Sequence, residues 1–161
     1  MSTAHHFPHR RSDTTVLQPV RSAAAIVAGL FAVVGVLGFV PGVTRGLSEI
    51  TFAGHDSGAL LLGAFAVSVL HNLVHLAFGA AGMAMARTSK GAREFLLLGG
   101  TIYLALWAYG MVVPHDSHAN FVPLNTADNW LHLGLAAAMI ATALLFGTHV
   151  ERTPITPPTP E

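Results

Sequence analysis

The sequence HNLVHL at residues 71–76 is echoed by DNWLHL at residues 128–133, and both follow the order polar, Asn, apolar, apolar, His, Leu. Each copy lies in or beside an apolar stretch long enough to cross a membrane, where an unpaired Asn or His is costly. His-Asp-Ser precedes both copies, at 55–57 and 115–117. The repetition indicates an internal duplication that places matching polar groups at matching depth in a small membrane bundle.

The composition is that of a membrane protein. Of the 161 residues, 52% are hydrophobic and 10% are charged, whereas soluble domains carry about 25% charged residues. The mean hydropathy is +0.57, so the lipid bilayer is the expected partner. The formal net charge is +0, so the chain lacks the excess of basic residues that is typical of nucleic-acid-binding proteins. The absence of cysteine excludes disulfides and thiolate metal sites, which leaves imidazole and carboxylate as metal ligands.

Apolar stretches define the predicted domain organisation. A membrane span needs about 20 apolar residues, and the sequence predicts an all-α integral membrane four-helix bundle over residues 20–148. The spans are predicted at 20–40, 66–86, 95–113 and 128–147. A disordered polar tail is expected at 1–19 and a disordered Pro-rich tail at 149–161.

Basic residues predict the orientation of the spans, because cytoplasmic loops carry an excess of Lys and Arg. Arg45 alone falls on one side of the membrane. The other side receives Arg10, Arg11, Arg21, Arg87, Lys90, Arg93 and Arg152. We therefore expect a multi-pass plasma-membrane protein with both termini in the cytoplasm and two longer loops outside.

The start of the second helix is predicted from the aligned repeats. The alignment pairs Ser68 with Asn125, and both are good N-cap residues. Asp128 then falls at the third helical position, where a carboxylate can accept a hydrogen bond from the cap. A helix that begins near Ser68 leaves 58–67 as a separate apolar segment. This segment is either a helical turn on the outer surface or a continuous extension of the helix.

The repeating unit is predicted to be a helical hairpin. The first and third spans both end in Val-Pro, at 40–41 and 113–114. Both hairpins would have the same orientation, so a pseudo-twofold axis would run along the membrane normal, as in parallel repeats. The two hairpins are thus expected to be alike.

The polar residues of the repeats share helix faces. His71 and His75 lie four residues apart, as do Asp128 and His132, so each pair stacks on one side of its helix. In a pseudo-symmetric bundle the two faces would meet near the outer side of the membrane. Asn and His are identical in the two copies of the repeat. We expect them to form an interhelical polar cluster of Asn72, His75, Asn129 and His132.

Three functions fit this cluster. In the first, the Asn and His pairs only hold the helices together, with hydrogen bonds worth roughly 0.6–2 kcal/mol each. In the second, the protein is a metal- or haem-binding module. In the third, it provides a path for protons or a small solute, because His can shuttle protons near neutral pH. The candidate metal ligands are His71, His75, Asp128, His132, His115 and His118.

The structural or accessory role is the leading interpretation. The sequence contains no nucleophile–base pair, P-loop or dinucleotide fingerprint, so an enzyme is not expected and no cofactor is predicted. The small size of the chain would suit a component of a larger membrane complex or a homo-oligomer.

Three segments resemble domain-of-unknown-function family 4383: LHNLVHLAFG at 70–79, LLLGGTIYLALWAYG at 96–110 and FVPLNTADNWLHLGL at 121–135. The resemblance covers about 20–147. It implies a small four-helix integral membrane protein of a kind common in high-GC Gram-positive bacteria. The chain departs from the family pattern at Ser68-Val69, where Asn-Pro is expected, although Ser can still cap the helix. The family supplies no activity.

Overall fold

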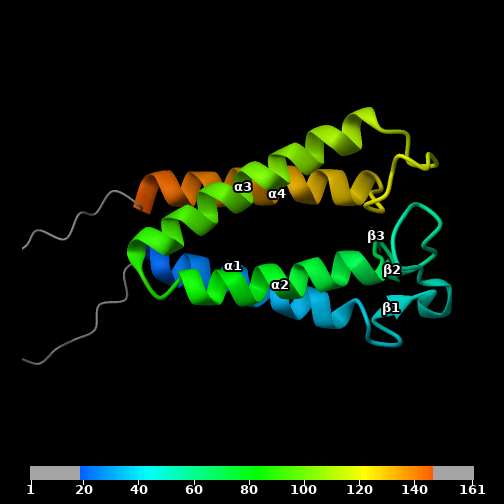
Figure 1. The fold of residues 1–161 in the computed structure, drawn as a ribbon, viewed down its shortest axis with the longest axis horizontal. Helices are drawn as coiled ribbons and strands as arrows, with labels where there is room; N and C mark the ends of the chain where they lie inside the picture. The colour runs from blue at the N-terminus through cyan, green and yellow to red at the C-terminus, as the bar shows by residue number, and fades with distance from the viewer. Residues whose placement is uncertain (1–18, 147–161) are drawn as a thin grey trace, which may run out of the picture.

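Four helices form a bundle with a small β-sheet at one end (Figure 1). The computed structural model describes residues 19–146. The helices are α1 (Pro19–Leu37), α2 (Val69–Met85), α3 (Ser89–Val112) and α4 (Thr126–Phe146). The predicted all-α four-helix architecture is confirmed. The predicted tails lie outside the described residues, apart from Pro19, which begins α1 and so does not belong to the N-terminal tail.

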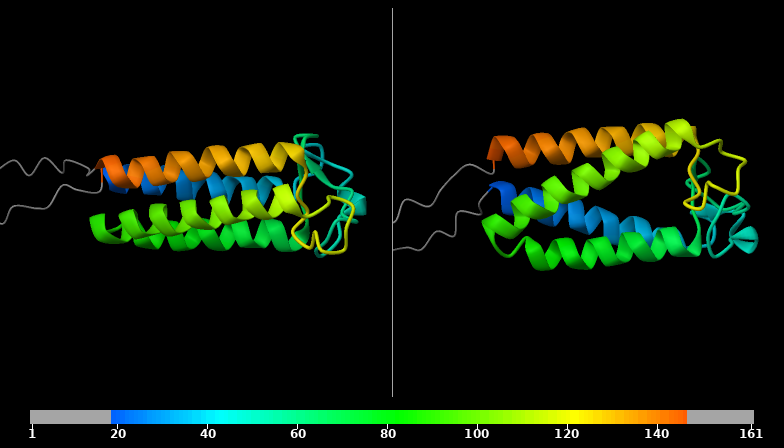
Figure 2. Two further views of the ribbon diagram at one scale, coloured as in Figure 1. Left: turned by 90° about the horizontal axis from the view of Figure 1, so that it is seen from above. Right: turned by 45° about the horizontal axis from the view of Figure 1, so that its top comes forward.

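The helices pack as two hairpins, α1 with α2 and α3 with α4, which lie side by side (Figures 1 and 2). The α2–α3 turn lies at one end of the bundle, and the two longer loops and the sheet lie at the other. We call these the turn end and the loop end. Small residues allow the helices to approach closely. A Cβ added at Gly79 would lie 2.9 Å from the Ala32 Cβ, and one added at Gly100 would lie 2.7 Å from Ile140 Cγ1.

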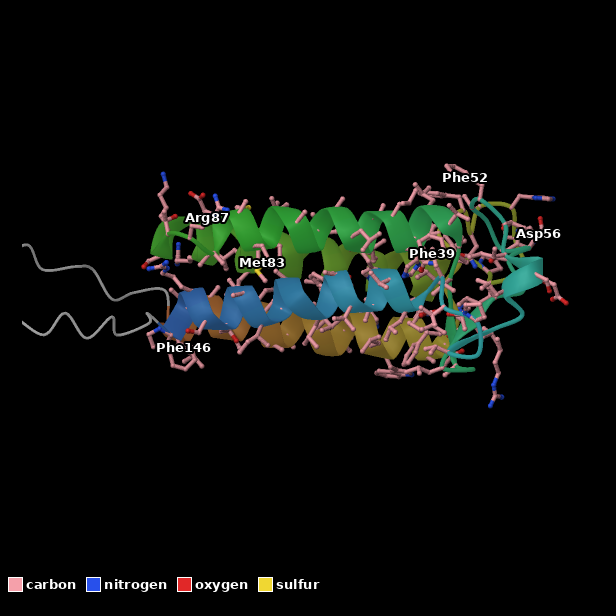
Figure 3. All side chains as sticks on the ribbon, turned by 90° about the horizontal axis from the view of Figure 1, so that it is seen from below. Phe39, Phe52, Asp56, Met83, Arg87 and Phe146 are labelled. Atoms are coloured by element: carbon pink, nitrogen blue, oxygen red, sulfur yellow. The ribbon has the colours of Figure 1, made fainter. Side chains whose placement is uncertain are left out.

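The surface of the bundle suits lipid. Helices α1, α3 and α4 are long and apolar enough to cross a membrane, and α2 is a shorter apolar helix of 17 residues, near the lower limit for a span. Large apolar side chains such as Leu30, Leu98 and Leu145 are exposed along the helices. Met83 and Phe146 lie on the outside of the bundle (Figure 3). Apolar surface of this extent indicates a membrane protein.

Capping side chains determine where α2 and α4 begin. The Ser68 hydroxyl accepts a hydrogen bond from the His71 N–H at 3.2 Å. Asn125 Oδ1 accepts from the N–H groups of Ala127 and Asp128 at 2.8 and 3.0 Å. Asp128 Oδ2 in turn accepts from the Asn125 N–H at 3.0 Å, which completes a reciprocal cap. The two aligned positions, Ser68 and Asn125, thus occupy equivalent places at the starts of two helices.

Helix α3 begins at Ser89, earlier than the predicted start at 95. Thr88 caps it, because its hydroxyl accepts from the Gly91 N–H at 3.0 Å. The first turns are polar, and Lys90 Nζ lies 3.7 Å from Glu94 Oε1. Hydropathy therefore detects only the part of this helix that follows the polar turns.

Residues 58–67 contradict both helical interpretations, because they form a β-hairpin. The strands are β1 (Thr44–Arg45), β2 (Leu60–Leu61) and β3 (Phe65–Ala66), in an antiparallel sheet ordered β1-β2-β3. A short 3-10 helix, Leu47–Glu49, follows β1. The turn after β2 places Leu62 and Gly63 at φ of 55° and 73°. This left-handed conformation interrupts any right-handed helix.

The bundle contains two apolar cores. The larger core fills the turn end of the bundle and includes Ala24, Ala28, Phe95, Leu96, Met139 and Ala143. The smaller core lies under the sheet and is formed by Ala59, Leu61 and Val67. The polar residues of the two repeats lie between these cores.

Candidate functional site

Each asparagine of the repeat packs against a glycine of its own hairpin. Asn129 on α4 donates from Nδ2 to the Gly110 carbonyl on α3 at 2.8 Å. A Cβ added at Gly110 would overlap the Asn129 amide. Asn72 on α2 lies equally close to Gly38, the first residue after α1, where a Cβ would overlap the Asn72 amide, but its Oδ1 and Nδ2 have no hydrogen-bond partner within residues 19–146. The asparagines thus join α1 to α2 and α3 to α4.

The histidines lie between the hairpins instead. His75 Nε2 and Tyr103 Oη form a hydrogen bond of 3.1 Å, which connects α2 to α3. The Tyr103 ring meets the His132 ring edge-on, with centroids 4.9 Å apart. The rings of His71 and His75 lie 4.5 Å apart, and Phe31 stacks on Tyr103 at 5.4 Å. Tyr103 therefore bridges the histidines of the two repeats.

The structure divides the predicted polar cluster of Asn72, His75, Asn129 and His132. The histidines line a common cavity, whereas each asparagine faces the helix that precedes it in the chain. The expectation that one continuous face of each repeat meets the other is wrong for the asparagines. The physical reason is geometric: Asn72 and His75 lie three residues apart and so point about 60° apart around α2, which is enough for Asn72 to face α1 while His75 faces α3.

Asp128 and Asn125 fasten the outer sheet to the start of α4. Asp128 is 2% exposed, and its Oδ2 accepts from the Ala66 N–H in β3 at 3.0 Å. Asn125 Nδ2 donates to the Ala64 carbonyl at 2.8 Å. Besides capping their own helix, the two side chains tether the segment that precedes α2.

The six metal-ligand candidates fall in three places. Four of them, His71, His75, Asp128 and His132, line the common cavity. His115 Nε2 lies 3.5 Å from Asn129 Nδ2, and the His118 ring packs on His55 with centroids 5.0 Å apart. Within residues 19–146, no group of three or more His, Asp or Glu has the geometry of a metal site. His115 and His118 therefore lie apart from the ligand set proposed with them.

Two cavities flank the histidines. One, of about 230 Å³, lies between α1 and α4 beneath the β2–β3 turn, and we call it the α1/α4 cavity. The other, of about 240 Å³, lies between α2 and α3 beneath residues 121–123, and we call it the α2/α3 cavity. The side chains common to both linings are His71, His75, Tyr103 and His132.

Sequence reasoning missed the partners of the repeated residues. The repeated sequence pattern assigns no role to Gly38, Gly110 or Tyr103. One signal was available: each glycine comes three or four residues before the proline that follows its span, Pro41 or Pro114. These glycines therefore lie at matching depth near the loop end.

Asn120 is a further residue that the sequence did not single out. It is 3% exposed, and its Nδ2 donates to the carbonyls of His115 and Leu124 at 2.9 and 3.1 Å. Its Oδ1 accepts from the Leu124 N–H at 3.1 Å. Asn120 thus folds the second outer loop over the α2/α3 cavity.

Residues 21–145 match the domain of unknown function DUF4383. The chain belongs to the DUF4383 family. The match includes nearly all of the four helices and both outer loops, so the asparagine contacts, the sheet tether and the two cavities all lie within the DUF4383 region. No curated protein and no solved structure matches the chain. Membership in DUF4383 establishes the family and assigns no activity.

Proposed function

We propose that this DUF4383 protein is a non-catalytic, accessory multi-pass protein of the plasma membrane, built from two like hairpins, whose Asn and His side chains hold the helices together. The observation that carries this proposal is the close packing of an Asn on a Gly in each hairpin, Asn72 on Gly38 and Asn129 on Gly110, the second with a hydrogen bond. In lipid, where helices gain no hydrophobic free energy from pairing, such close contacts and hydrogen bonds stabilise association.

The link between the hairpins supports the same role. His75 of the first hairpin and Tyr103 of the second form a partly buried hydrogen bond. The cavities support the proposed duplication, because a twofold that exchanges α1 with α3 and α2 with α4 also exchanges the α1/α4 cavity with the α2/α3 cavity. The proposed hairpin repeat therefore accounts for both the contacts and the spaces between them.

The orientation is proposed from the described charges. Arg21, Arg87, Lys90 and Arg93 lie at the turn end of the bundle, and Arg45 lies at the loop end. Figure 3 shows Arg87 and Asp56 at opposite ends. The excess of positive charge favours a cytoplasmic turn end, which would place both termini in the cytoplasm.

Cysteine labelling tests the orientation, because the chain has no cysteine of its own. Asp56→Cys and Lys90→Cys place single thiols at opposite ends, at side chains that are 73% and 86% exposed. We expect a membrane-impermeant maleimide to label Asp56→Cys in intact cells and Lys90→Cys only after permeabilisation. The reverse pattern would contradict the proposed topology.

Stability measurements test the structural role. We expect Asn129→Ala and His75→Ala each to lower the free energy of unfolding by about 0.6–2 kcal/mol in detergent. Thr101→Ala is the matched control, because the exposed Thr101 hydroxyl bonds only to the Leu97 carbonyl of its own helix. Unchanged stability in both test variants would refute the proposal.

Analysis of the purified protein for metal and haem distinguishes this structural role from the alternative of a metal- or haem-binding module. Stoichiometric metal by elemental analysis, or a Soret band that disappears on replacing His75 or His132, would overturn the structural assignment in favour of a cofactor-binding one. Affinity purification from native membranes tests the accessory role, because an accessory protein should travel with a larger complex or with copies of itself.

A further inference from the structure

The two cavities have walls suited to a flat ring. Phe31 and Tyr103 stack with an interplanar angle of 5°, and the His132 ring stands edge-on to Tyr103 at 66°. Both cavities are lined by the rings of His71, His75, Tyr103 and His132. Aromatic side chains bind planar rings by offset or edge-on stacking.

The mouths of the cavities open toward lipid. Leu30 and Leu131 border the α1/α4 cavity and are 57% and 44% exposed. Val74 and Ile102 border the α2/α3 cavity and are 47% and 36% exposed. All four belong to helices of the membrane bundle. A molecule dissolved in the bilayer would therefore reach either cavity sideways, past apolar side chains.

The wall between the cavities also carries polar atoms without partners. His132 is 3% exposed, and its Nδ1 has no hydrogen-bond partner within residues 19–146. The same holds for His71 Nδ1. A buried polar atom that lacks a partner costs roughly 1–3 kcal/mol, and this cost is recovered when a ligand supplies the missing bond. An imidazole nitrogen can pair with a carbonyl or a hydroxyl.

The charges around the cavities exclude an ionic head group. In the described part of the chain no Lys or Arg lines either cavity. Asp128 is the one acidic residue in these linings, and its Oδ2 already accepts from the Ala66 and Asn125 N–H groups. An anionic ligand would lose its hydration without gaining a counter-ion, and a cationic ligand would meet only Asp128, which already accepts two hydrogen bonds.

We propose that the paired cavities bind an uncharged, membrane-soluble molecule whose ring-sized head group carries carbonyl or hydroxyl oxygens that hydrogen-bond His132 and His71. Each cavity is smaller than the roughly 300–1,000 Å³ of sites for drug-sized ligands, so only the head group enters and the apolar tail stays in the bilayer. A prenylated quinone has this chemistry, whereas a neutral lipid such as a diacylglycerol offers ester carbonyls and a hydroxyl without a ring. The site goes beyond the structural role, because the asparagine contacts hold with or without a ligand.

The test uses the full chain in nanodiscs, titrated with a naphthoquinone that carries a short isoprenoid tail and, separately, with a diacylglycerol. We expect saturable binding of the naphthoquinone, measured with each ligand in radiolabelled form and corrected for its partition into empty nanodiscs. His132→Phe keeps a ring of similar size without the polar atoms and should weaken binding about tenfold, as expected for the loss of about 1.4 kcal/mol. Thr101→Ala should bind as the unmodified protein does.

A second variant keeps the proposal testable if His132→Phe fails to fold. Val74→Trp places a large ring at the lipid-facing mouth of the α2/α3 cavity and leaves the histidines in place. We expect it to weaken binding of the naphthoquinone. Saturable binding of the diacylglycerol alone would overturn the proposal of a ring-sized head group, because diacylglycerol has no ring. Binding that never saturates, or that neither variant alters, would overturn the proposal. The structural role is tested independently of ligand binding by the free energy of unfolding of Asn129→Ala.

Discussion

The contact between Gly110 and Asn129 predicts an unusual cost for a small substitution. Gly110→Ala should improve the intrinsic helix propensity of α3 by about 1 kcal/mol. The new methyl group would overlap Asn129 Oδ1, however, and would lie 2.7 Å from Asn129 Cγ. The Asn129 side chain must then move away from the Gly110 carbonyl, to which it now donates at 2.8 Å.

The expected magnitude follows from these opposing effects. Overpacking of a dense site costs about 1–3 kcal/mol, and loss of an interhelical hydrogen bond in the membrane costs about 0.6–1.7 kcal/mol. Subtracting the gain of about 1 kcal/mol in helix propensity leaves Gly110→Ala destabilising by about 0.6–3.7 kcal/mol. The sign is opposite to that expected for an unobstructed helical glycine.

Gly134 supplies the matched control. It lies in α4, and a Cβ added there meets nothing within 4 Å. Gly134→Ala should therefore leave the protein unchanged or stabilise it by up to about 1 kcal/mol. The assay is unfolding in mixed micelles of a mild detergent and sodium dodecyl sulfate, followed by circular dichroism.

A double-mutant cycle decides whether the cost comes from Asn129. In Gly110→Ala with Asn129→Ala, the methyl group has room, so the double variant should be less destabilised than the sum of the two single variants by about 1 kcal/mol or more. Additive effects, or a Gly110→Ala variant as stable as Gly134→Ala, would refute the reasoning.

Three further outcomes are expected at related sites. Gly38→Ala should destabilise the protein by about 1–3 kcal/mol in the same assay, because its methyl group would overlap the Asn72 amide. Asp128→Ala should cost about 1–3 kcal/mol through the loss of two hydrogen bonds of 3.0 Å, and hydrogen exchange at the Ala66 amide should become faster. Thr88→Ala should cost about 0.5–2 kcal/mol by removing the cap of α3, with faster exchange confined to the first turn of that helix.

The helices could be predicted from the sequence because their determinants are local. Continuous apolar runs and the capping residues Ser68 and Asn125 suffice to place α2 and α4 to within a few residues. The sheet could not be predicted in this way. Residues 58–67 are as apolar as a membrane helix, and what decides their structure is pairing with β1 and the tether from Asp128. Both partners are distant in sequence.

The candidate site likewise combines features that the local sequence predicts with contacts that it does not predict. The spacing of Asn72, His75, Asn129 and His132 identifies the residues that differ from an ordinary apolar helix. The spacing does not identify their partners, because residues that share a helix face can still contact different neighbours. Gly38 and Gly110 have no side chain to signal their role, and only the close approach of Asn72 and Asn129 reveals it.

The two repeats diverge where their outer loops differ. His71 and Asp128 occupy the same place in their helices, since the N–H of each donates to the cap residue three positions earlier. Asp128 also holds the sheet formed by the first outer loop, whereas Asn120 organises the second loop from within it. The second loop therefore needs no tether from α2, and position 71 is free to carry an imidazole that lines both cavities. On this reasoning the Asp–His difference between HNLVHL and DNWLHL is a consequence of the two loops, and the Asn and His that follow are what the hairpins have in common.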